Sequence, residues 1–277
     1  MAYRCFDVDV QDKVAQVRLS RPDELNSMVP EFWRELPEIV QGLSDSGEVR
    51  AVVLSSTGKH FSAGMDLSVF TGGALADQGE PGRAGANLSI LVRRLQDALT
   101  TLEQVRMPVL AAVQGGCIGG AVDLVTACDM RYATQDAFFV VQETNIGMTA
   151  DVGTLQRLPK IIPDGVAREL VYTGRRMPAA RAYEVGLVNE VFPDHEALLA
   201  GVTAIAAEIA AHSPLAVWGC KEMLVHARDH AVVDGLAHVA AWQSGAFKPA
   251  DLMESFAAKA EKRPPQYQDL PPAPTRL

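Results

Sequence analysis

The feature that most constrains the fold is a strand, a glycine-rich turn and a helix that follow one another directly. Residues 108–113 form a short, continuous apolar run, which is typical of a β-strand buried on both faces. Gly115-Gly116-Cys117-Ile118-Gly119-Gly120 comes next, and residues 121–127 begin a helix. A helix that starts at such a turn offers unpaired backbone N–H groups to an anion. The segment therefore predicts a layered α/β fold and a place that can hold negative charge.

The same order of elements recurs in the first two thirds of the chain. Short apolar or alternating segments predict a hairpin over residues 6–10 and 14–19, a buried strand over 51–55, and a third pair of strands over 129–132 and 138–141. Helices are predicted over residues 29–43, with Asn26 as the cap, and over 88–105, with a mobile loop over 71–87. Because Cys117 breaks the G-x-G-x-x-G pattern, the repeat indicates stacked ββα units and no dinucleotide-binding sheet.

The chain changes character after about residue 191. Four Ala-rich helices are predicted over residues 196–211, 214–228, 232–244 and 249–262, followed by an irregular, proline-rich tail. We therefore divide the chain into a core (residues 1–195) and a C-terminal helical region (residues 196–277). The helical region is expected to close the domain and to form subunit contacts.

Bulk properties exclude several classes of function. The net charge of −9 argues against a nucleic-acid surface. The least polar stretch is too short to span a membrane, and no metal-ligand spacing is visible. The four cysteines lie far apart, as reduced thiols of an intracellular protein do. The first residues lack the pattern of a signal peptide or presequence, and Thr275-Arg276-Leu277 only loosely matches a peroxisomal address, so a cytoplasmic location is expected.

Three acids near the glycine turn are the candidate catalytic groups: Asp123, Glu143 and Asp151. Acids beside an oxyanion-binding turn suit proton transfer next to a carbonyl, where an enolate must be stabilised. Each has a simpler interpretation. Asp151 alone reads as the N-cap of a helix over residues 152–158, Asp123 as an acid favoured by a helix dipole, and Glu143 as a solvated loop carboxylate.

Longer segments resemble a known family. His60-Phe61-Ser62-Ala63-Gly64-Met65-Asp66, residues 108–113, the Gly119-Gly120 turn and Gln156-Arg157-Leu158 resemble the crotonase (enoyl-CoA hydratase/isomerase) superfamily. The similarity covers residues 6–262. Within it, residues 115–124, 134–139 and 150–160 are most similar to the Δ3,5-Δ2,4-dienoyl-CoA isomerases.

The resemblance implies a spiral of ββα units, an acyl-CoA substrate and no separate cofactor, because coenzyme A is part of the substrate. It implies that the N–H groups of Met65 and Gly120 form an oxyanion hole. Glu143 would be the base at C2, Asp151 the acid at C6 and Asp123 an auxiliary acid, in an isomerase of fatty-acid β-oxidation. The residues expected to bind the acyl-CoA are Ser62, Ala63, Gly64, Met65, Asp66 and Gly119.

Other interpretations stay open at this point. On their own, Ser62 and His60 read as structural residues and Asp66 as a helix cap. A hydratase that adds water to a 2-enoyl-CoA needs no acid at position 151, so Asp151 favours the isomerase. A non-catalytic acyl-CoA-binding relative is a further alternative. The family further implies a homotrimer, or a homohexamer built from two trimers.

Overall fold

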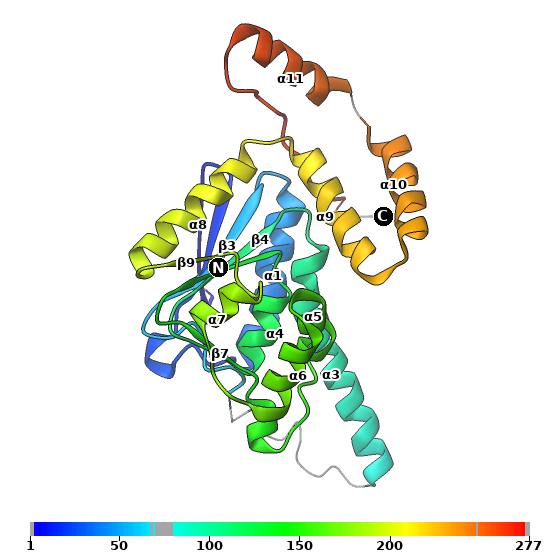
Figure 1. Ribbon diagram of the computed structural model, residues 1–277. Helices are drawn as coiled ribbons and strands as arrows, with labels where there is room; N and C mark the ends of the chain where they lie inside the picture. Colours follow the sequence, from blue (N-terminus) through cyan, green and yellow to red (C-terminus); the bar gives the residue numbers. More distant parts are fainter. Residues whose placement is uncertain (1–2, 67–68, 70–79, 248, 275–277) are drawn as a thin grey trace.

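A six-stranded sheet with the order β1-β2-β3-β4-β6-β9 is the centre of the computed structural model, which describes residues 3–66, 69, 80–247 and 249–274 (Figure 1). β1 and β2 form the predicted antiparallel hairpin, and the other neighbouring strands are parallel. The strands are β1 (Phe6–Gln11), β2 (Val14–Leu19), β3 (Ala51–Ser56), β4 (Val109–Val113), β6 (Met130–Thr134) and β9 (Glu190–Phe192).

A second, smaller sheet contains β5 (Gly116–Ile118), β7 (Phe138–Val140) and β8 (Met177–Pro178) in the order β5-β7-β8. β4, β5 and α4 (Gly120–Thr126) form one ββα unit, and β6, β7 and α5 (Thr154–Ile161) form the next. β3, a segment in which Ser62 pairs with Cys117, and α3 (Pro81–Gln104) repeat the order. The predicted stack of ββα units is confirmed. The predicted third strand pair needs correction, because β6 and β7 bond to different sheets.

The alternating side chains of β3 show why its apolar run is continuous. Val52 and Leu54 belong to the core that includes α1 (Pro30–Ser46) and α3, whereas Ala51 and Val53 pack with α8 (His195–Ala210). Helices therefore cover both faces of the parallel part of the sheet, and each residue of β3 is buried. The C-terminal region thus begins with α8, which packs against one face of this sheet.

The predicted cap of α1 is wrong. α1 begins at Pro30 with Val29 in the N-cap position and without a side-chain cap. Asn26 is buried and left-handed (φ +52°), and its amide donates to the carbonyl oxygens of Thr57 and His60. Buried carbonyl groups need such donors, and this need outweighs the cap role that the local sequence favours.

The end of the predicted 71–87 loop is also wrong. α3 begins at Pro81, because the Glu80 carboxylate accepts hydrogen bonds from the N–H groups of Gly82 and Arg83. Pro81 at the first helical position supports the same start, despite the glycines that follow. Residues 71–79 of the predicted loop lie outside the described residues.

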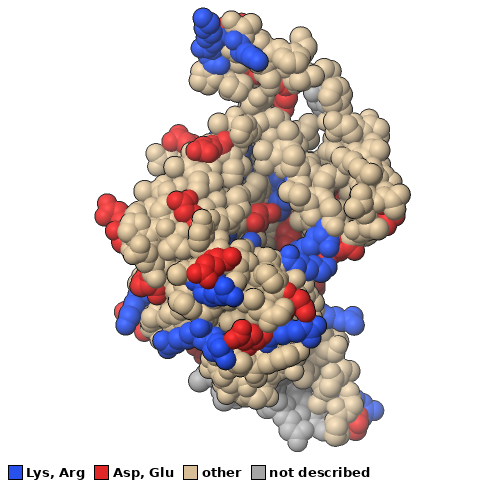
Figure 2. Space-filling view, viewed as in Figure 1, with Lys and Arg blue, Asp and Glu red and all other residues tan. Residues whose placement is uncertain are grey.

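The remaining helical segments are η1 (Pro22–Glu24), η2 (Glu143–Ile146), α6 (Asp164–Thr173), α7 (Ala179–Glu184), α9 (Pro214–Asp229), α10 (Val232–Ala246) and α11 (Pro249–Glu261). We call α10 and α11 the C-terminal arm, since they extend away from the body (Figure 1). Trp242 of the arm packs edge-to-face on Trp218 of α9 at 5.1 Å. No residue of α10 is buried, and most of its visible surface carries no charge (Figure 2).

The tail over residues 263–274 has no helix or strand, as predicted, and runs back to the N-terminal half. The carboxylate of Asp269 pairs with Lys13 at 2.5 Å and with Arg50 at 2.9 Å. Arg50 also donates to the carbonyl oxygen of Tyr267, and Arg106 to that of Pro271. The tail therefore ties the end of the arm to the β1–β2 turn, to the start of β3 and to the loop after α3.

Three features of the described residues bear on other functions. No single helix in the described residues is long and apolar enough to cross a membrane. Taken together, α8 and α9 have the length and composition of a membrane span, but the pair is bent by 107°. No group of three or more His, Cys, Asp or Glu side chains in that part of the chain is arranged to hold a metal ion. All four cysteines are free, and Cys117 is completely buried in the glycine turn.

Candidate active site

The glycine turn links β4 to α4 through β5, and its backbone needs glycine at two points. Gly115 and Gly119 are left-handed, with φ of +56° and +55°. A Cβ on Gly115 would lie 2.2 Å from the carbonyl oxygen of Lys59. The N–H of Gly116 donates to His60 Nδ1 at 2.9 Å, so His60 stabilises the turn, in line with its structural interpretation.

Two backbone N–H groups meet at the start of α4. A Cβ on Gly64 would lie 3.1 Å from the Gly120 nitrogen, and a Cβ on Gly120 would lie 3.5 Å from the Met65 nitrogen. Neither N–H donates to a backbone carbonyl across the described residues. Two free amides at a helix N-terminus suit an oxygen that carries negative charge.

Glu143 faces this pair of amides across Gly119. It follows β7 as the first residue of η2, and a Cβ on Gly119 would lie 3.3 Å from its Oε1 atom. Its Oε2 atom is buried and has no hydrogen-bond partner in the described part of the chain. An unpaired buried carboxylate oxygen costs free energy, and a catalytic role is one reason for a protein to retain it. The solvated-loop interpretation therefore does not hold.

Asp123 lies in the first turn of α4 and is only 1% exposed. Its Oδ1 atom accepts a 2.6 Å hydrogen bond from the N–H of Thr154, the first residue of α5. Asp123 therefore supplies the carboxylate at this helix N-terminus. Asp151 is not the cap, since α5 begins three residues later with Gly153 in the N-cap position.

The three acids form one electrostatic group. Burial, and then the charge of Asp123, raise the pKa of Glu143 to about 7. Burial raises the pKa of Asp123 to about 6, against the hydrogen bond from Thr154. Burial also raises the pKa of Asp151. Carboxyl groups in such a cluster do not all ionise near neutral pH, so the site can hold a base and an acid together.

The other predicted substrate-binding residues lie around the same turn. Ser62 is buried, and its hydroxyl donates to the carbonyl oxygen of Asn26 and accepts from the N–H of Gly64, which supports its structural interpretation. Asp66 accepts a hydrogen bond from Ser27, and of the residues directly after it, which it was expected to cap, only residue 69 is described. Ala63 lines a cavity of about 380 Å³ together with Ile118 and His60.

Two cations at this cavity escaped the sequence analysis. Lys59 and Arg176 line it, and the Arg176 guanidinium lies 4.4 Å from the centre of the Phe138 ring. Lys59 directly precedes the His60–Asp66 segment that resembles the family, and this position could have marked it as a candidate binding residue. Arg176 comes from a distant loop and has no comparable signal.

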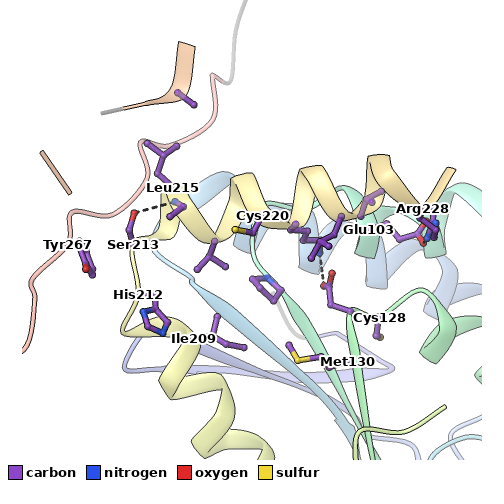
Figure 3. A pocket seen from close by; sticks show the side chains of 18 of the residues that line it. Glu103, Cys128, Met130, Ile209, His212, Ser213, Leu215, Cys220, Arg228 and Tyr267 are labelled. Atoms are coloured by element: carbon purple, nitrogen blue, oxygen red, sulfur yellow. Dashed lines mark hydrogen bonds and ion pairs between the residues drawn. The ribbon is translucent and has the colours of Figure 1, made fainter. Parts of the chain in front are cut away.

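The larger cavity, of about 890 Å³, lies between α9 and the sheet (Figure 3). None of the three acids lines it. Apolar groups such as Ile209, Leu215 and Met130 form much of its wall, and Glu103 and Arg228 lie at one end. It therefore belongs to the junction between the body and the C-terminal helices.

Stacked ββα units, free amides at a glycine turn, and three acids, of which Asp123 is buried and the other two are half-buried, define an α/β enzyme suited to proton transfer beside an acyl oxygen. The sequence profile of the enoyl-CoA hydratase/isomerase family matches residues 9–270. The chain belongs to this family.

Individual relatives refine the comparison. The chain is 44% identical over 255 residues to the rat mitochondrial Δ3,5-Δ2,4-dienoyl-CoA isomerase, covering 91% of this chain and 78% of the relative. It is 39% identical to the peroxisomal enzyme of that name from Arabidopsis thaliana, covering 97% and 99%. A solved structure titled as a putative enoyl-CoA hydratase from Streptomyces coelicolor superposes with a TM-score of 0.85 at 28% identity, covering 96% and 95%.

These comparisons correct the expected location. The rat relative is named mitochondrial and the Arabidopsis relative peroxisomal, which contradicts a cytoplasmic assignment. The prediction failed because organelle addresses are short segments that the catalytic fold does not require.

Proposed function

We propose that this protein isomerises 3,5-dienoyl-CoA thioesters to 2,4-dienoyl-CoA thioesters in fatty-acid β-oxidation. The observation that carries the proposal is the third acid: Asp151 shares one electrostatic group with Glu143 and Asp123. A hydratase has no use for an acid at this position. The relatives named as dienoyl-CoA isomerases match almost the whole chain.

In the proposed mechanism, ionised Glu143 takes a proton from C2 of the substrate. The electrons of the C2–H bond delocalise over the diene to the thioester oxygen, and the N–H groups of Met65 and Gly120 stabilise the resulting dienolate. Protonated Asp151 then delivers a proton to C6, so the double bonds move to C2–C3 and C4–C5. The free oxygen of Glu143 and the raised pKa of Asp151 support these roles.

Asp123 has an auxiliary role in this scheme. Its carboxyl group holds the N-terminus of α5 through Thr154, and its charge raises the pKa of Glu143. Asp123 therefore both holds the segment that follows Asp151 in place and raises the basicity of Glu143. An oxyanion donor in other enzymes contributes about 10²–10³ in rate, and a general acid about 10²–10⁴.

The polar part of the coenzyme A moiety is proposed to enter beside Ala63. The adjoining cavity carries Lys59 and Arg176, two cations that suit phosphate groups. Gly64 and Gly119 let the backbone approach the thioester closely, and Asp66 follows the Met65 amide. The reaction needs no separate cofactor, because coenzyme A is part of the substrate.

A homotrimer, alone or paired into a hexamer, is the proposed assembly. The C-terminal arm leaves large apolar side chains on its surface, including Val232 at 80% and Phe256 at 59% exposure. An apolar surface of this kind is typical of a subunit interface. Light scattering coupled to size-exclusion chromatography tests the assembly, and a monomer at micromolar concentration would contradict it.

The decisive experiment combines two substrates with one variant. Purified enzyme is mixed with 3,5-octadienoyl-CoA, and the conjugated 2,4-dienoyl product is followed by absorbance. We expect rapid isomerisation that falls at least about 10²-fold in Asp151→Asn, as loss of a general acid predicts. Asp164→Asn, at an exposed carboxylate of α6, is the matched control and should retain the rate.

The same experiment separates the alternatives. Hydration of crotonyl-CoA without isomerisation would identify a hydratase and leave Asp151 without a catalytic role. Tight binding of acyl-CoA without turnover of either substrate would identify a non-catalytic relative.

A further inference from the structure

A buried arginine underlies the turn that carries Asp151. Arg157 of α5 is 9% exposed, and its guanidinium binds both carboxylate oxygens of Glu103, each at 3.0 Å. It also donates to Thr100 Oγ1 at 3.0 Å and to the carbonyl oxygen of Val152 at 3.4 Å. Arg157 therefore connects α3 to the residue directly after Asp151.

The turn is shaped around this guanidinium. Gly153 has φ of +133°, and a Cβ on it would lie 1.9 Å from the Nη1 atom of Arg157. The arginine head thus occupies the space of a side chain at position 153. The next residue, Thr154, donates its N–H to Asp123. A shift of Arg157 would consequently move Val152, which follows Asp151, and Thr154, which donates to Asp123.

One face of α3 holds the whole segment. Gln96 donates to the carbonyl oxygen of Asp151 at 2.6 Å, while Thr100 and Glu103 bind Arg157. Residues 96, 100 and 103 are spaced by about one helical turn and so lie on the same side of α3. Arg228 of α9 also pairs with Glu103, which joins the C-terminal region to this support (Figure 3).

We propose that the Arg157–Glu103 ion pair is a positioning element for the acid Asp151, an inference that rests on the proposed isomerase mechanism. Arg157 touches no reacting atom in that mechanism. It fixes the Val152–Thr154 turn, so that the Asp151 carboxyl group stays at the far end of the diene from Glu143. Its positive charge also lowers the pKa of Asp123, against the larger effect of burial.

Arg157→Lys tests this role, because lysine keeps the charge but cannot bind Glu103 and Val152 together. Two rates are measured with 3,5-octadienoyl-CoA: isomerisation, and incorporation of deuterium at C2 from D₂O. Exchange at C2 needs only Glu143, whereas isomerisation also needs Asp151. We expect isomerisation to fall about 10²-fold, the effect of misplacing a catalytic group by about 1 Å, while exchange at C2 changes less than about threefold.

The ratio of the two rates distinguishes positioning from general damage. Asp151→Asn should change the ratio in the same direction, and Arg228→Met, which removes the other arginine on Glu103, should leave it at the wild-type value. An Arg157→Lys enzyme in which both rates fall together, or in which neither falls, would overturn the proposal. If Arg157→Lys does not fold, Glu103→Gln is measured instead, and an unchanged ratio there would overturn it equally.

Failure of the underlying mechanism has a different signature. A wild-type enzyme that does not isomerise the dienoyl substrate would refute the proposed reaction and the positioning role with it. A wild-type enzyme that isomerises, combined with an unchanged ratio in Arg157→Lys, would refute only the positioning role.

Discussion

Replacement of Asp123 by Asn should stabilise the protein at alkaline pH and not at acid pH. Burial raises the pKa of Asp123 from 3.8 to about 6 in the folded state. Between pH 3.8 and about pH 6 the folded protein holds a proton that the unfolded chain has released, so the free energy of unfolding of the wild type falls as the pH rises. The rise in pKa corresponds to about 3 kcal/mol, since one pKa unit is worth about 1.36 kcal/mol.

Asparagine has no charge to lose, and its amide oxygen can still accept the hydrogen bond from Thr154. The difference in free energy of unfolding, Asp123→Asn minus wild type, should therefore be about 2 kcal/mol larger at pH 8 than at pH 4, because the unfolded aspartate is already partly ionised at pH 4. Comparison of two pH values removes any pH-independent effect of the substitution. The assay is urea unfolding followed by circular dichroism at one fixed protein concentration.

The exposed carboxylate Asp164 provides the control, because Asp164→Asn should give the same difference at both pH values within about 0.5 kcal/mol. A pH-independent difference for Asp123→Asn would refute the reasoning. It would mean that the Thr154 hydrogen bond compensates fully for burial and that Asp123 ionises as an ordinary aspartate.

Two further predictions concern the glycine turn and the arm. Gly119→Ala places a Cβ 3.3 Å from Glu143 Oε1 at a φ of +55°, so the isomerisation rate should fall at least about tenfold. Gly42→Ala is the control and should retain full activity, because there is open space around Gly42. Equal isomerisation rates in the two variants would contradict this prediction. The His226 ring stacks on those of His230 and His238 at 3.8 and 4.0 Å, and desolvation, followed by these neighbours, lowers its pKa. The stack therefore stabilises α9 and α10 above about pH 6.5 and loses this effect as the pH falls. Hydrogen exchange of these helices, corrected for intrinsic rates, should be faster at pH 5.5 than at pH 8, and His238→Phe should reduce the difference; protection that is the same at both pH values would count against the stack.

Local patterns predicted the elements whose structure depends on nearby residues. The apolar run at 51–55 and the helices after residue 195 appear within a few residues of their predicted bounds. Such segments are specified by burial on both faces or by helical periodicity, and both are visible in the sequence. The three candidate acids came from the sequence too, but their roles came from the family resemblance.

Long-range requirements were not visible in the sequence. Asn26 looks like a helix cap, yet its amide is needed by carbonyl groups more than thirty residues away. Asp151 looks like a cap for α5, yet Asp123 takes that place from another unit of the spiral. β6 and β7 follow one another but join separate sheets. Each outcome depends on which segments meet in space, and single-sequence patterns do not contain that information.

The tail also has a consequence for the order in which the protein can be completed. Lys13 and Asp269 are separated by 256 positions, and Arg50 and Asp269 by 219. During synthesis the hairpin and β3 are made long before their partner Asp269, so these ion pairs can form only when the chain is essentially complete. The ion pairs of Asp269 are therefore among the last contacts that a newly made chain can form. Truncation before Asp269 would remove its ion pairs with Lys13 and Arg50, while the hydrogen bond between Ser213 and Asp251 would still hold α11 at the start of α9.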